Sequence, residues 1–101
     1  MHFHGNSNEN PNPHHLYAIF DKELDDLFKF GISHDTIDSD GLSDRPRNQI
    51  RFLNLAVGWP RYFVKILLRD IQGRRAAKEI EDRFIAEFAE KHGQNPRGNL
   101  D

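Results

Sequence analysis

The chain has 101 residues, of which 37% are hydrophobic, and its mean hydropathy is −0.77. These values suit one domain with a small core. Cysteine is absent, which excludes disulfides and thiolate metal sites. No apolar run approaches the roughly 20 residues that span a bilayer, and the chain does not open with a charged-then-apolar signal. We therefore expect no membrane association and no classical signal peptide.

The net charge of −2 hides an uneven distribution along the chain. Residues 1–41 carry two Lys against eight Asp and Glu, whereas residues 42–83 carry ten Lys and Arg against five Asp and Glu. Most cations of this basic middle are Arg, the side chain suited to forked contacts with phosphate. The pattern is typical of nucleic-acid binding, although a solvated charged surface would give the same counts.

The first elements are predicted from apolar runs on either side of a charged segment. Residues 1–13 are rich in Asn, His and Pro, which predicts a flexible linker or N-terminal arm. Apolar runs at residues 16–20 and 27–32 flank the charged residues 21–26 and predict two antiparallel strands joined by a hairpin. Gly31, near the end of the second run, would let another backbone or a ligand come close.

A polar loop at residues 33–45 precedes the first predicted helix. Ser43 or Asp44 would cap this helix, Pro46 suits its first turn, and apolar residues then recur at helical spacing. Gly58 would end it.

The rest of the chain predicts one more strand and one more helix. The apolar run at residues 62–68 reads as a third strand, expected at the centre of the sheet. Residues 74–92 carry an apolar stripe at helical spacing, and Gly93 would end that helix. The order β-β-α-β-α predicts an α+β fold: a small three-stranded mixed sheet covered by helices on one side.

Several short motifs accompany this order: Leu16-Tyr17, Lys29-Phe30-Gly31-Ile32-Ser33, Gly41-Leu42-Ser43 and Pro96-Arg97-Gly98-Asn99. Together they resemble the GIY-YIG (URI-fold) nuclease superfamily, most closely the URI-type toxin modules at the carboxyl ends of bacterial polymorphic toxins. The likeness covers residues 14–99, which we expect to form the nuclease or toxin domain. One departure is clear, because Lys29-Phe30-Gly31 stands where the family has Tyr-Ile-Gly, so the second Tyr is missing.

The resemblance implies a set of functional residues. Tyr17 matches the Tyr that activates or positions the attacking water. Arg45 matches the helix-start Arg that holds the scissile phosphate, with Arg51 as its rival. Glu81 matches a metal-binding Glu, and Asn99 a closing Asn that contacts phosphate.

Three further residues complete the set. Lys29 would face phosphate as a cation or serve as the proton partner of Tyr17, while Gly31 and His34 lie near the mouth of the second strand. The expected catalytic residues are Tyr17, Lys29, Arg45 and Glu81, the last of which also binds metal. The expected substrate-binding residues are Gly31, His34, Arg51 and Asn99.

The resemblance implies a metal-dependent endonuclease that cleaves phosphodiester bonds, with DNA as the expected substrate and Mg²⁺ or Mn²⁺ as cofactor. A lone carboxylate suffices for such a cation, because Mg²⁺ keeps most of its waters. A phenol with a pKa of about 10 is a poor base unless a cation lowers that pKa. A cognate immunity protein is the expected partner. The module would be exported as part of a larger bacterial toxin and act in the target-cell cytoplasm.

Other interpretations stay open. The missing Tyr would permit a catalytically inactive nucleic-acid-binding module of the same fold. The chain could instead be a non-enzymatic protein-interaction domain that docks through the helix at residues 74–92. Individually, Tyr17 also suits a packing aromatic, Glu81 suits an ion pair with Lys78 or Arg74, and Arg45 suits a solvated loop cation.

Overall fold

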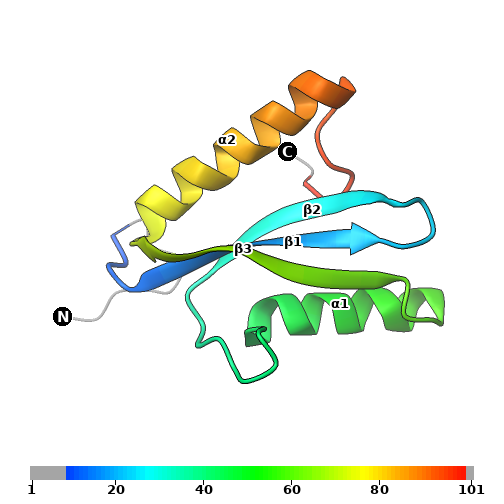
Figure 1. Cartoon of the computed structure of the whole chain (residues 1–101), viewed down its shortest axis with the longest axis horizontal. Helices are drawn as coiled ribbons and strands as arrows, with labels where there is room; N and C mark the ends of the chain where they lie inside the picture. Colours follow the sequence, from blue (N-terminus) through cyan, green and yellow to red (C-terminus); the bar gives the residue numbers. More distant parts are fainter. Residues whose placement is uncertain (1–8, 100–101) are drawn as a thin grey trace.

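The computed structural model describes residues 9–99, and their secondary structure follows the predicted order. Strands β1 (Pro13–Asp21) and β2 (Asp26–Ser33) form the hairpin, followed by helix α1 (Asp44–Val57), strand β3 (Tyr62–Gln72) and helix α2 (Arg74–His92) (Figure 1). Ser43 is the N-cap of α1, and Gly58 and Gly93 end the two helices in the left-handed conformation. The α+β class and the element order are confirmed.

The three strands form one sheet in the order β2-β1-β3, and both pairings are antiparallel. The sheet is therefore antiparallel throughout, and the predictions of a mixed sheet and of a central third strand are wrong. The central strand is β1, in which six consecutive residues from His14 to Ile19 are buried. Only a strand with neighbours on both edges and helices on both faces can bury such a run.

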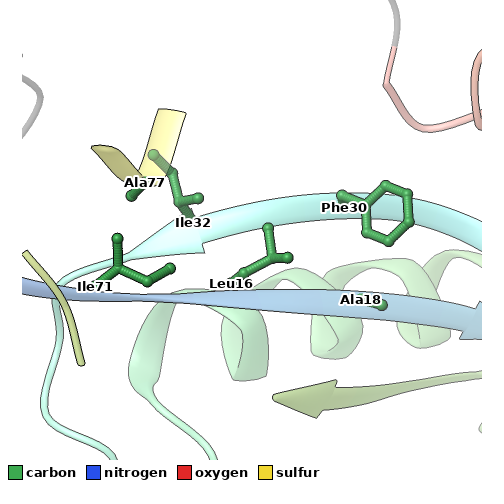
Figure 2. Packing of buried hydrophobic residues seen from close by; sticks show 6 residues of the cluster. All are labelled: Leu16, Ala18, Phe30, Ile32, Ile71 and Ala77. Carbon is green, nitrogen blue, oxygen red and sulfur yellow. The ribbon is translucent and has the colours of Figure 1, made fainter. Parts of the chain in front are cut away.

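The two helices cover opposite faces of the sheet (Figure 1). Leu16 and Ala18 of β1 belong to the cluster on the α2 face (Figure 2), in which Ala77 of α2 lies beside Ile32 at one end. The alternate residues Tyr17 and Ile19 belong to a second cluster, which packs against α1. The prediction of helices on one side is therefore wrong, since strand alternation sends half of the apolar side chains of β1 to each face.

The turn between β1 and β2 is held by a buried carboxylate. Asp21 is 1% exposed, and Arg61 binds it through two hydrogen bonds, Nε to Oδ1 and Nη2 to Oδ2, each of 2.8 Å. Arg97 adds a contact of 3.0 Å to Oδ2. These guanidinium groups hold the pKa of Asp21 well below its usual range, because they stabilise the ionised form more than burial disfavours it. Asp21 therefore ties the predicted hairpin turn to Arg61 and Arg97, which lie far from it in the sequence.

The fold begins before residue 14. Asn10 is buried, and its carbonyl oxygen accepts a hydrogen bond of 3.0 Å from the N–H of Arg74. The rest of the predicted arm, residues 1–8, lies outside the described residues. Within residues 9–99, neither helix has the length and apolar character that crossing a membrane requires.

Candidate active site

The phenol ring of Tyr17 lies across the edge strand β2 at Gly31. The two residues are direct partners in the β1–β2 ladder. A Cβ atom at residue 31 would lie 2.7 Å from Tyr17 Cε1, and nearer still to Cζ and the hydroxyl oxygen. Glycine therefore leaves the space that the ring occupies, as a strand glycine at a close approach is expected to do. The group that comes close is the Tyr17 side chain of the neighbouring strand.

The Tyr17 hydroxyl contacts helix α1 at the edge strand β2. It donates a hydrogen bond of 2.7 Å to Oε1 of Gln49. Burial raises the pKa of Tyr17, and the negative charge of Glu81 acts in the same direction. Arg45 and Gln49 oppose this shift but do not outweigh it. Tyr17 is therefore a neutral phenol at neutral pH. The positive charge of Arg45 does not lower its pKa enough to make it a base.

Lys29 lies near Tyr17 on the same face of the sheet, two residue pairs along the ladder from Gly31. Its pairing partner in β1 is Ile19, which belongs to the α1-facing cluster. Burial and the positive charge of Arg45 lower the pKa of Lys29, while Glu81 acts in the opposite direction. Lys29 therefore gives up its proton more readily than an ordinary lysine.

The other two predicted catalytic residues, Arg45 and Glu81, lie near enough for their charges to act on Tyr17 and Lys29. Tyr17 and Lys29 come from the hairpin, Arg45 from the first turn of α1, and Glu81 from α2 on the other face. Because β2 is an edge strand, side chains from both faces can reach around it.

The start of α1 is fixed by the loop before it. The hydroxyl of Ser43, the N-cap, lies 2.7 Å from Nε2 of His15, and both side chains are buried. The backbone N–H of Arg45 donates to Oδ2 of Asp35 at 3.1 Å. Arg51 lies six residues further along the helix and is exposed, whereas Arg45 is among the groups whose charge acts on both Tyr17 and Lys29. The structure thus favours Arg45 over Arg51 as the helix-start arginine of the site.

Glu81 is 8% exposed, and its Oε1 lies 2.8 Å from Nζ of Lys78, which confirms the predicted ion pair. Within residues 9–99, no three His, Asp or Glu side chains are placed to hold a metal ion together. Glu81 could still contribute to a Mg²⁺ or Mn²⁺ site, because such a cation needs only one or two carboxylates when substrate phosphate and water complete its shell. The donor set thus fits a cation shared with substrate and does not fit a closed protein cage.

The family model described as URI fold toxin 2 matches residues 7–93, most of the chain. The chain belongs to the URI fold toxin 2 family. The predicted likeness to URI-type toxin modules is thereby confirmed, and membership indicates a nuclease-like toxin domain. Comparisons with curated proteins and with solved structures gave no match.

The tail of this URI fold toxin domain runs along the free edge of β2. Oδ1 of Asn99 accepts a hydrogen bond of 2.7 Å from the N–H of Phe30, and Nδ2 donates one of 2.9 Å to its carbonyl oxygen. The N–H of Gly98 donates to the carbonyl oxygen of Phe28 at 2.8 Å. Asn99 lines a groove with Glu81, so it lies at the site. Its contacts are with the strand backbone, and a phosphate contact stays a prediction.

His34 lies apart from this cluster in the URI fold toxin domain. Its ring centroid is 5.5 Å from that of His14, and it lines a different groove together with His15 and Arg69.

The residue that sequence reasoning missed is Gln49. It accepts the Tyr17 hydrogen bond and lies four residues after Arg45, so both side chains share one face of α1. That i, i+4 spacing is the signal that could have found it.

Part of the basic middle is neutralised within the domain. Arg47 forms ion pairs with Asp38, Asp40 and Asp44, and Arg61 forms them with Asp21 and Glu23. In the described part of the chain, Arg45 and Lys29 form no ion pair. The positive charge of these two side chains is therefore available to a ligand, as is that of other cations of the basic middle, such as Arg51 and Arg69, that form no ion pair among residues 9–99.

Proposed function

We propose that this domain is a metal-dependent endonuclease that hydrolyses phosphodiester bonds of nucleic acid, with DNA as the expected substrate. The observation that carries the proposal is the position of the Tyr17 hydroxyl, which lies at Gly31 of the edge strand β2 and bonds to Gln49 of α1. Lys29 lies on the same edge strand, and the charges of Arg45 and Glu81 act on both Tyr17 and Lys29. A hydroxyl, two cations and a carboxylate are the groups that phosphodiester hydrolysis needs. Membership of a toxin family whose domains are nuclease-like supports the same reaction.

In this reaction the oxygen of a water molecule attacks phosphorus, the bond to the leaving oxygen breaks, and the leaving oxygen takes up a proton. The neutral Tyr17 hydroxyl orients the water, because its raised pKa makes it a weak base. Protonated Lys29 donates the proton that the leaving oxygen takes up, since its lowered pKa makes it a better proton donor than an ordinary lysine. The proton that the attacking water loses passes to solvent. Arg45 neutralises the charge that develops on the phosphate oxygens. Lys29 thereby takes the place of the family's second Tyr.

Glu81 is the residue that would hold Mg²⁺ or Mn²⁺, together with the substrate phosphate. When bound, the cation supplies Lewis-acid stabilisation of negative charge on the phosphate. Lys78, three residues earlier in α2, forms an ion pair of 2.8 Å with the Glu81 carboxylate.

The proposal is tested by incubating purified protein with supercoiled plasmid and with RNA, each with Mg²⁺ and with EDTA. Wild type is expected to relax or linearise the plasmid only with metal. Glu81→Gln keeps the size of the side chain and is expected to lose at least about a hundredfold in rate. Glu87→Ala removes an exposed carboxylate further along α2 and serves as the matched control.

Each other outcome has a definite meaning. Cleavage of RNA alone would keep the chemistry and change the substrate. Intact nucleic acid that still shifts on a gel would indicate an inactive binding module. Neither cleavage nor a shift would refute the nuclease and leave a protein-interaction domain. Equal cleavage by wild type and Glu81→Gln would refute the metal assignment.

We further propose that the domain is delivered as part of a larger bacterial toxin, acts in the target-cell cytoplasm and is inhibited by a cognate immunity protein. Family membership supports this biological setting. Expression of wild type in the bacterial cytoplasm is then expected to stop growth, whereas Glu81→Gln at equal protein level is not. Normal growth with folded, soluble wild type would contradict the proposal.

A further inference from the structure

An open groove of about 520 Å³ leads away from the catalytic cluster along the α1 side of β2. Lys29 and Gln49 lie on its wall, so it begins at residues that contact or adjoin Tyr17. Phe28 and Phe52 line it further along. Its volume falls in the range of ligand sites, roughly 300–1,000 Å³. The groove therefore extends the proposed active site by a second, aromatic part.

Phe52 presents its ring to solvent, being 73% exposed. Its helical neighbours Ile50 and Leu53 pack against the Tyr17 cluster, so the sheet does not need Phe52 as a core residue. Gln49 and Phe52 are three residues apart and are thus adjacent on the helix surface. The exposed ring consequently stands next to the residue that holds the Tyr17 hydroxyl.

The opposite wall of the groove is held in place. The Phe28 ring packs edge-on against Tyr62 at 5.1 Å, and the Arg97 guanidinium lies 5.3 Å from its centroid. Gly98 allows the tail to approach this ring, since a Cβ there would lie 2.6 Å from Phe28 Cε2. Phe52 therefore faces an ordered, partly aromatic surface.

An aromatic ring beside a cation suits a nucleotide. Lys29 forms no ion pair among residues 9–99, so its charge at the start of the groove complements a phosphate. Stacking on an exposed aromatic side chain is a common way to bind the adjoining base in single strands. A base inside a duplex has both faces covered by its neighbours, so it cannot offer a face to Phe52.

We propose that Phe52 stacks on one unpaired base of the substrate strand next to the scissile phosphate, so that the domain prefers single-stranded or unpaired nucleic acid over fully paired duplex. This inference rests on the proposed nuclease function and names its substrate class. The juxtaposition of Lys29, Gln49 and Phe52 in one groove carries it.

The test is a binding measurement with a short single-stranded oligonucleotide that contains 2-aminopurine, whose fluorescence falls when it stacks. Glu81→Gln is the background, so that the probe is not cut. Phe52→Ala is expected to weaken binding about tenfold and to remove the quenching. Phe52→Trp is expected to keep both. Leu55→Ala removes an apolar side chain that is 81% exposed on the same helix and lies outside the groove, and it is expected to change neither.

The same probe in a blunt duplex is expected to bind at least about tenfold more weakly than the single strand. Equal quenching in the Glu81→Gln background with and without the Phe52→Ala substitution would overturn the inference. Equal affinity for duplex and single strand would overturn it as well. If the protein forms a concentration-dependent dimer and Phe52→Ala makes it monomeric, Phe52 binds a second copy of the chain, which would also overturn the inference. Circular dichroism checks that the variants are folded, since an exposed position should tolerate the change.

Failure of this inference is distinguishable from failure of the nuclease. Phe52-dependent quenching without any cleavage by wild type would refute the proposed function and retain the stacking site. Metal-dependent cleavage of single strands that Phe52→Ala leaves unchanged would retain the function and refute the site. Absence of all nucleic-acid binding would refute both.

Discussion

The substitution Gly31→Ala tests how the site is assembled. The added Cβ would lie 2.7 Å from Tyr17 Cε1, whereas ordinary contact begins at 3.4 Å. The ring must therefore move by more than about 0.7 Å, the difference between these distances, because Cζ and the hydroxyl oxygen lie nearer still to the added Cβ. Overpacking of this kind costs about 1–3 kcal/mol, and loss of the Tyr17–Gln49 hydrogen bond adds about 1 kcal/mol. Alanine itself is more favourable than glycine in a strand by about 0.5–1 kcal/mol.

The expected net loss in free energy of unfolding is therefore about 1–3 kcal/mol. Urea unfolding measures it, with Tyr17→Leu as a second background in which the ring is absent. In that background Gly31→Ala should cost nothing or stabilise slightly, which gives a coupling free energy of about 2 kcal/mol. Because a displacement of about 1 Å can cost a hundredfold in rate, cleavage by the single variant should fall by about that factor.

Two results would refute this reasoning. Equal destabilisation by Gly31→Ala in both backgrounds would show that the cost does not come from Tyr17. A folded Gly31→Ala protein with wild-type cleavage would show that the position of the Tyr17 hydroxyl is not critical for the reaction.

Three further predictions concern single residues. Burial lowers the pKa of Lys29, so the charged Lys29 side chain lowers the free energy of unfolding at pH values below that pKa. Lys29→Met should raise the urea midpoint at pH 7 while cutting cleavage at least about a hundredfold, and its stability gain should shrink toward pH 10; a lower midpoint at pH 7 would contradict this. Asp21→Asn should cost about 3–5 kcal/mol in urea at pH 6. Because the folded pKa of Asp21 is depressed, this difference should narrow as pH falls from about 4 to 2, and a constant difference would count against the ion cluster. Asn99→Ala should speed hydrogen exchange at the Phe30 amide, measured by mass spectrometry, because that amide loses its acceptor; unchanged exchange would leave Asn99 with a substrate role only.

Local signals in the sequence determined the elements of this domain. The charged segment between two apolar runs predicted the hairpin, and Gly58 and Gly93 marked the helix ends, because each feature acts through neighbouring residues. The family resemblance named Tyr17 and Glu81, and the negative charge of Glu81 acts on the pKa of Tyr17. The order of residues along the chain sufficed for this much.

Only the tertiary structure decided how the elements are arranged and what the site residues experience. The strand order depends on which strand of the hairpin β3 pairs with. The sequence therefore did not reveal that β1 is central or that the helices cover opposite faces. The sequence showed Asp21 only as part of a charged segment, whereas the fold buries it between Arg61 and Arg97, which are 40 and 76 residues away. Likewise the pKa of Tyr17 rises because the fold buries it. Burial and charge separation are properties of distance in space, which spacing along the chain does not specify.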